Sequence, residues 1–171
     1  SFRLPAKVLD EEIGYILDMG AEIHYKHRIE SMQTLLDQGY DEVFVGTGAG
    51  YPSFMGIPGE SLNGVLSANE LLTRCNLMHA REFPDYDTPL QPGRRVVVIG
   101  AGNTAMDALR VSRRLGAESV RCLYRRSRAE APARAEELHH AEEEGIEFHW
   151  LASPVELLDD GKRNVRAVRC I

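Results

Sequence analysis

The chain has 171 residues, of which 43% are hydrophobic and 27% are charged, and its formal net charge is −6. These values are typical of one globular domain or of two incomplete ones. The acidic balance argues against nucleic acid as a main partner. The sequence also has no signal-peptide pattern and no apolar run long enough to span a membrane, so we expect no membrane partner.

The cysteines and histidines give no sign of a metal site. Cys75, Cys122 and Cys170 are widely spaced and form no Cys-x-x-Cys motif, and the six histidines include no His-x-x-x-His pair. Isolated cysteines of this kind suit a reducing compartment, so we expect a cytoplasmic protein.

The first 50 residues alternate between helical and strand patterns. Apolar residues spaced along 7–19 predict a helix that ends at Gly20, and a weaker helical pattern covers 31–38. Short apolar runs predict strands over 22–25 and 41–47. The chain begins at Ser1 without an initiator methionine, and we expect it to be an internal part of a longer protein.

A glycine cluster follows the second of these strands, with the sequence Gly46-Thr47-Gly48-Ala49-Gly50. Pro52 and Pro58 come soon afterwards and disfavour a helix there, so the cluster is not predicted to be a dinucleotide fingerprint. The loop is either a crossover linker or a stretch of backbone that contacts a bound group.

The next predicted helix covers 67–79. Ser67 can cap it, and Glu70 stands at the position that would complete a capping box. Residues 81–93 then include three prolines, and they form the best candidate for a domain boundary.

The strongest motif lies between Val96 and Ala105. Four β-branched residues at 96–99 predict a strand buried on both faces, and Gly-x-Gly-x-x-Ala and a helical pattern follow at once. This order is typical of dinucleotide binding. Gly100 allows the tight turn, Gly102 lets a pyrophosphate approach the backbone, and Ala105 lets the helix pack closely on the strand. A purely structural turn is the alternative.

The remaining elements continue this pattern. Strands are predicted over 119–124 and 146–151, and a helix over 133–144 between them. Two further strands, 154–158 and 165–171, flank a turn at Asp159-Asp160-Gly161-Lys162. The order predicts an α/β fold: a Rossmann-like parallel sheet in three layers with helices on its faces, followed by a β-hairpin or meander.

The residues after the second strand of this unit indicate which dinucleotide binds. Domains that bind NAD place a carboxylate there to hold the ribose 2′-hydroxyl. This chain has Tyr124-Arg125-Arg126-Ser127-Arg128 instead. Guanidinium groups bind a 2′-phosphate, which a carboxylate would repel, so the predicted cofactor is NADP(H). A solvated basic loop is the alternative.

Arg134, at the start of the following helix, is a further candidate phosphate ligand. An ion pair within the helix, for example with Glu137, is an equally good interpretation of the sequence.

Several stretches match one family and occur in that family's order. They are residues 2–5, 46–49, 56–60, 67–70, 98–107 and 124–126. On these stretches the chain resembles the small (beta) subunit of NADPH-dependent glutamate synthase. It is similar also to its relatives, the nucleotide-binding part of dihydropyrimidine dehydrogenase and the large subunit of NADH-dependent ferredoxin:NADP oxidoreductases.

The resemblance implies two interleaved domains, one for FAD and one for NADPH. Residues 1–50 would belong to the FAD-binding domain, 51–94 would connect, and 95–171 would form the NADPH-binding domain. The implied cofactor-binding residues are Thr47, Gly48 and Ala49 near the flavin, Gly100, Gly102, Asn103, Thr104 and Ala105 at the pyrophosphate, and Arg125, Arg126 and Arg134 at the 2′-phosphate.

The family's reaction passes a hydride from NADPH to FAD. Electrons then cross iron–sulfur clusters to a large subunit, where glutamine and 2-oxoglutarate become two glutamates. This sequence lacks the FAD fingerprint and the cluster cysteines, so the clusters would lie elsewhere and the chain alone would be inactive. No residue is predicted to be a catalytic acid, base or nucleophile. The alternatives are a ferredoxin, sulfide or pyrimidine reductase subunit, and a non-catalytic nucleotide-binding interaction module.

Overall fold

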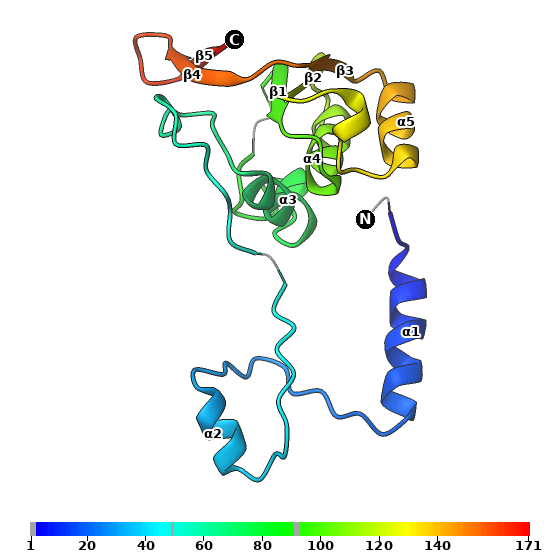
Figure 1. Cartoon of the computed structure of the whole chain (residues 1–171). Helices are drawn as coiled ribbons and strands as arrows, with labels where there is room; N and C mark the ends of the chain where they lie inside the picture. The colour runs from blue at the N-terminus through cyan, green and yellow to red at the C-terminus, as the bar shows by residue number, and fades with distance from the viewer. Residues whose placement is uncertain (1–2, 49, 91–92) are drawn as a thin grey trace. The chain divides into compact units, whose positions relative to one another are not determined.

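The computed structural model describes residues 3–48, 50–90 and 93–171, which divide into two compact units, Ser1–Gly48 and Ala49–Ile171 (Figure 1). The first unit contains helices α1 (Ala6–Asp18) and α2 (Met32–Asp37). Both agree with the helical patterns. Helix α1 ends where Gly20, at φ +96°, donates its backbone N–H to the carbonyl of Leu17 at 2.9 Å.

The strands predicted over 22–25 and 41–47 are wrong, because the described residues of this unit form no strand. A strand needs a neighbour to pair its backbone N–H and C=O groups. No such neighbour is present among these residues, and Phe44 in the second segment is 97% exposed. The two segments are apolar, as their sequences show, but an apolar run forms a strand only where a second strand is available to pair with it.

The second unit is built on a parallel three-stranded sheet, β1 (Arg95–Ile99), β2 (Ser119–Tyr124) and β3 (Glu147–Trp150), in the order β1-β2-β3. Helices α4 (Asn103–Arg114) and α5 (Ala135–Glu143) connect the strands. The register pairs Val98 with Cys122, and Cys122 with Phe148. The predicted β-α-β-α-β order is confirmed.

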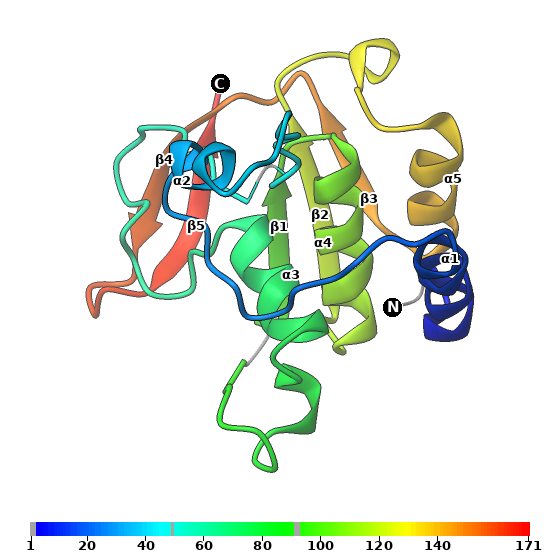
Figure 2. The same cartoon turned by 90° about the horizontal axis from the view of Figure 1, so that it is seen from below.

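One face of the sheet carries the core. Met106 and Leu109 of α4 are fully buried against Val120 and Cys122, and α5 adds Ala141 to the same cluster. Figure 2 shows α4 covering one face of the sheet, over β1 and β2. The opposite face presents exposed side chains, including Val97 and an ion pair between Arg121 and Glu147. The described residues thus form two of the layers expected for this fold class.

Helix α3 (Ala68–Asn76) packs on α4 and is followed by the short helix η1 (Ala80–Glu82). The hydroxyl of Ser67 accepts the backbone N–H of Glu70 at 3.1 Å, as expected for a cap. The carboxylate of Glu70 pairs with Arg74 at 2.8 Å, one turn further along the helix. The cap is therefore confirmed, and the glutamate contributes an ion pair within the helix.

Strands β4 (Pro154–Asp159) and β5 (Val165–Cys170) form the predicted antiparallel hairpin, as a separate two-stranded sheet. The loop near residue 59 is fixed to this hairpin. Leu157 donates its N–H to the carbonyl of Pro58 at 2.9 Å, and a Cβ at Gly59 would lie 2.2 Å from the carbonyl oxygen of Leu157. Only glycine fits at this position, because a side chain would clash with that carbonyl oxygen and because Gly59 has φ +90°, which residues with a side chain rarely adopt.

Candidate functional site

The glycine turn begins where β1 ends. Gly100 has φ +120°, a conformation that L-residues with a side chain rarely adopt. Its N–H donates to the carbonyl of Leu123 at 2.9 Å, which extends the pairing with β2 by one residue. A Cβ at this position would meet only the Cβ of Ala105, at 3.9 Å. The backbone conformation, rather than crowding, therefore accounts for Gly100.

Gly102 is different. It is the N-cap residue of α4 at φ −87° and ψ 174°, an extended conformation open to any residue. A Cβ there would lie 3.9 Å from a side-chain carbon of Pro132, which is ordinary van der Waals contact. Neither the fold nor crowding within the protein demands glycine here. Close approach of a ligand to the bare backbone is the remaining physical reason for it.

The start of α4 is open to an anion. No side chain caps it, and its first turn contains no acidic residue. Asn103 and Thr104 are exposed, whereas Ala105 is 8% exposed and belongs to the core. The first backbone N–H groups of a helix lack partners within it, and the helix dipole places partial positive charge there. This is the arrangement that binds a phosphate group.

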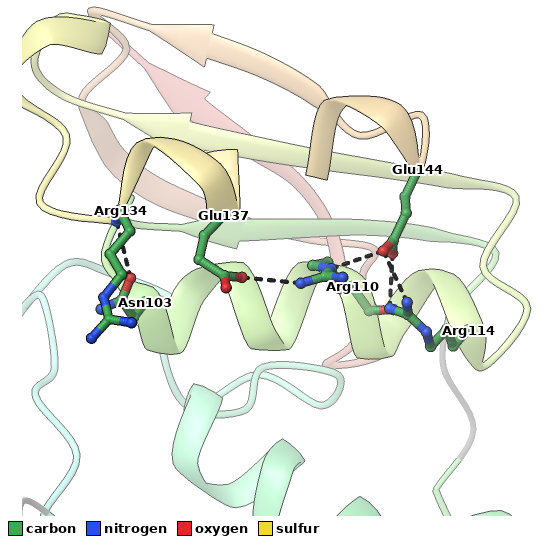
Figure 3. Close-up of polar contacts among 6 residues, drawn as sticks. All are labelled: Asn103, Arg110, Arg114, Arg134, Glu137 and Glu144. Carbon is green, nitrogen blue, oxygen red and sulfur yellow. Dashed lines mark hydrogen bonds and ion pairs between the residues drawn. The ribbon is translucent and has the colours of Figure 1, made fainter. Parts of the chain in front are cut away.

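The segment that precedes α5 returns to this turn. Ala133 donates its N–H to the carbonyl of Ala101 at 3.1 Å, and Arg134 donates its N–H to Oδ1 of Asn103 at 3.2 Å (Figure 3). The side chain of Asn103 thus joins the start of α4 to the start of α5. This contact spans 31 residues, and no motif in the sequence predicts it.

The arginines after β2 fall into two groups. Arg125 and Arg126 are exposed at the end of the strand. Among the described residues, no carboxylate pairs with the guanidinium group of Arg125 or of Arg134. Arg128, in the short helix η2 (Arg128–Glu130), instead forms a two-pronged ion pair with Glu142 of α5. That pairing lowers the pKa of the Glu142 carboxyl and raises the pKa of Arg128.

The loop itself is ordered by Ser127 and Glu130. The carboxylate of Glu130 accepts both the N–H and the hydroxyl of Ser127, at 3.0 Å each. These hydrogen bonds lower the pKa of Glu130, and the positive charge of Arg126 contributes in the same direction. The capping arrangement fixes the backbone that follows the two exposed arginines.

Two of the three residues expected near a flavin, Thr47 and Gly48, lie in the first unit. Thr47 is exposed and Gly48 has φ +73°, while Ala49 lies outside the described residues. In the described part of Ser1–Gly48, no strand and glycine turn lead into a helix. These residues alone therefore do not build a dinucleotide cradle.

The described residues contain no group of three or more side chains that could hold a metal ion. Within the same ranges, no helix is both long and apolar enough to cross a membrane.

The parallel sheet, the glycine turn and the uncapped helix define the class of dinucleotide-binding α/β domains. The family of pyridine nucleotide-disulphide oxidoreductases matches residues 6–169, and the chain belongs to this family. The chain is 37% identical to the NADP(+)-dependent formate dehydrogenase subunit beta of Moorella thermoacetica, over 100% of this chain and 24% of that protein. It is 36% identical to the glutamate synthase [NADPH] small chain of Azospirillum brasilense, over 98% of this chain and 36% of that protein.

Solved structures share the fold. FprA from Mycobacterium tuberculosis, a mutant form, aligns with a TM-score of 0.61 at 21% identity, over 79% of this chain and 44% of that chain. FprA in complex with NADPH aligns with a TM-score of 0.55 at 20% identity, over 80% and 48%. The expected α/β fold class and the resemblance to the glutamate synthase small subunit and its relatives are confirmed. The chain spans only about a quarter to a third of those two relatives.

Proposed function

We propose that this chain is the NADP(H)-binding part of a flavin-dependent oxidoreductase. One observation carries the proposal: two exposed arginines, and no acid, stand at the end of β2 beside an open glycine turn. A carboxylate at that position would select the free ribose hydroxyl, and guanidinium groups select a 2′-phosphate. Oxidoreductase chemistry is supported by the family to which the chain belongs.

The residues of the site fit this cofactor. The backbone at Gly100 and Gly102 and the first N–H groups of α4, from Asn103 to Ala105, would hold the pyrophosphate. Arg125, Arg126 and Arg134 would hold the 2′-phosphate. When both cofactors are bound, NADPH supplies a hydride that FAD accepts. Such a transfer needs aligned rings more than an acid or base, which suits a site without either.

For the longer protein, we propose that residues 1–50 belong to an FAD-binding domain, with Thr47, Gly48 and Ala49 near the flavin. Residues 51–94 would connect to a nucleotide-binding domain at 95–171. The first unit as described builds no flavin cradle of its own, so we expect the isolated chain to lack turnover. A purified chain that carried stoichiometric FAD and reduced a dye with NADPH would contradict this.

The electron acceptor is a separate proposal. We infer a cytoplasmic glutamate synthase small subunit, working with a large subunit that converts glutamine and 2-oxoglutarate to two glutamates through iron–sulfur clusters held elsewhere. Relatives named as glutamate synthase small chains support this. An alternative has comparable support, because relatives named NADP(+)-dependent formate dehydrogenase and NADPH-Fe(3+) oxidoreductase beta subunits are equally similar. Glutamine-dependent NADPH oxidation by the complete assembly would support glutamate synthase, and its absence would favour another acceptor.

The nucleotide is tested by titration of the full-length protein with NADPH and NADH. Substitution of Arg125 and Arg126 by alanine should weaken NADPH binding by more than about 100-fold, because each of the two charge-assisted contacts contributes about 1.5–3 kcal/mol. NADH binding should change little. Arg121→Ala is the matched control, because Arg121 lies on the face of the sheet that α4 does not cover and its guanidinium group pairs with Glu147. An equal loss of NADH binding in the double variant would refute the 2′-phosphate assignment.

A further inference from the structure

Arg110, in the middle of α4, binds two carboxylates (Figure 3). One belongs to Glu137 of α5, and the other to Glu144, the residue that follows α5. Nη1 of Arg110 donates to Oε2 of Glu137 at 3.0 Å, and its Nε donates to Oε1 of Glu144 at 2.8 Å. The side chains of Arg110 and Glu137 are only 10% and 14% exposed. Water screens such a buried ion pair only weakly, so the attraction of Arg110 holds the carboxylate of Glu137 in this orientation.

Glu137 lies one helical turn from Arg134, which is proposed to bind the 2′-phosphate. It lies in the first turn of α5, and its N–H donates to the carbonyl of Arg134 at 3.0 Å. Arg134 is the N-cap residue of α5 and Glu137 is the third residue of the helix, a position from which a carboxylate can reach back to the N-cap residue. In the structure the carboxylate of Glu137 turns to Arg110, and the side chain of Arg134 is directed away from Glu137 (Figure 3). The backbone N–H of Arg134 donates to Asn103 at the start of α4.

We propose that Arg110 is a positioning residue for nucleotide selectivity, because it holds the carboxylate of Glu137 away from Arg134. This inference rests on the proposed function, in which Arg134 binds the 2′-phosphate. Without Arg110, Glu137 would pair with Arg134 and bring a negative charge toward the phosphate. The loss of Arg134 as a ligand and the added negative charge would both weaken the binding of NADP(H), which carries the 2′-phosphate. Neither would affect the binding of NAD(H), which lacks that phosphate.

The test compares the affinities of the full-length protein for NADP+ and NAD+ by calorimetric titration. Arg110→Met keeps an unbranched apolar side chain and removes the donors. It should weaken NADP+ binding about tenfold relative to NAD+, the change expected when one sheltered charge turns toward a phosphate. Adding Glu137→Gln to this variant should restore the NADP+ preference, because the released side chain is then neutral.

Two further variants separate a positioning role from a structural one. Glu137→Gln alone leaves Arg110 bonded to Glu144 and should keep or increase the NADP+ preference, so a decrease would overturn the proposal even if Arg110→Met fails to fold. Arg114→Met is the matched control, because Arg114 pairs with Glu144 one turn further along α4. It should leave the preference unchanged.

Equal weakening of both nucleotides in Arg110→Met, without rescue by Glu137→Gln, would show that Arg110 only stabilises the packing of α5 and would overturn the inference. That result would leave the proposed function intact. A wild-type protein that binds neither nucleotide would refute the proposed function itself, and this inference with it.

Discussion

Gly100 and Gly102 occupy the same turn for different physical reasons, and substitution should separate them. Gly100→Ala forces a side chain onto φ +120°, which should cost about 1–3 kcal/mol of unfolding free energy. Gly102→Ala should leave stability nearly unchanged, because its backbone is extended and the new methyl group has room. The methyl group would, however, occupy the ligand's side of the turn and weaken NADPH binding at least tenfold.

The measurements are urea unfolding for stability and NADPH titration for binding, made on both variants. The two substitutions add the same atoms two residues apart, so each serves as the control for the other. If Gly102→Ala lost as much stability as Gly100→Ala, Gly102 would be a structural glycine and its assignment to the ligand would fail.

The cysteines should differ strongly in reactivity. Cys122 is fully buried, and burial raises the pKa of its thiol to about 12. Its thiol lies 3.2 Å from the carbonyl oxygen of Gly100 in the core behind the glycine turn. Cys75 is also buried with a raised pKa, whereas Cys170 is exposed. Because the thiolate is the reactive form, one thiol should react quickly at pH 8 and the other two slowly.

An aromatic disulfide reagent, followed by absorbance, counts the thiols in the native and the denatured chain. Cys170→Ser should abolish the fast phase and leave the slow phase unchanged. Equal rates for all three thiols would mean that the core around Cys122 opens readily.

Residue types were predictable from sequence where the reason for them is local. The conformation of Gly100 and the burial of Ala105 follow from a strand, a turn and a helix that are contiguous in the chain. The hydrogen bond of Asn103 to Arg134 and the ion pair of Arg128 with Glu142 were not predictable, because the partners lie 31 and 14 residues away in the sequence. The sequence showed three similar arginines after β2, and only the position of α5 reveals that Arg128 is already engaged by Glu142.

The turn between β4 and β5 depends on the ionised carboxylate of Asp160. Oxygens of Asp160 accept the N–H groups of Lys162 and Asn164 at 2.7 and 3.1 Å, and also the side-chain amide of Asn164 at 2.9 Å. These bonds, that to the Asn164 side chain foremost, lower the pKa of Asp160 to about 2. A lowered pKa stabilises the hairpin above the ordinary value of 3.8, and this contribution is lost as pH falls toward 2.

An NMR titration of the Asp160 side chain should therefore show a midpoint near 2, well below that of an ordinary aspartate. Asp160→Asn keeps the size of the side chain but removes its charge, so it should remove this pH dependence of the β4–β5 hairpin. A wild-type midpoint near 4 would show that the turn does not hold the carboxylate.

Helices and strands were predictable from sequence where neighbouring elements of the chain bury each other's apolar faces. The β-α-β-α-β order of β1, α4, β2, α5 and β3 predicted the parallel sheet, because strands rich in β-branched residues and amphipathic helices bury each other's apolar faces. The segments at 22–25 and 41–47 have comparable apolar runs and form no strand. Their apolar composition was visible in the sequence, but strand formation depends on a neighbour that an apolar run does not specify.

At the scale of the whole molecule, burial is distributed unevenly. All the fully buried side chains of the described residues, such as Met106 and Leu109, lie in the unit Ala49–Ile171. The described part of Ser1–Gly48 has no buried residue, and α1 exposes large apolar side chains, including Tyr15 at 66% and Ile16 at 52%. A helix whose apolar side has no core to pack against gains little stability from tertiary contacts.

This contrast yields a test of the proposed FAD-binding domain. In the isolated chain, backbone amides of α1 should exchange with deuterium within seconds, while those of β1, β2 and α4 should be protected for minutes or longer. In the full-length protein with FAD, α1 should gain protection by at least tenfold, because the proposed domain would cover its apolar side. Amides of β2 are the internal control and should change little between the two samples. If α1 exchanged equally fast in both, residues 1–50 would not be packed into a folded domain, and the proposed assignment of Thr47 and Gly48 to the flavin would fail with it.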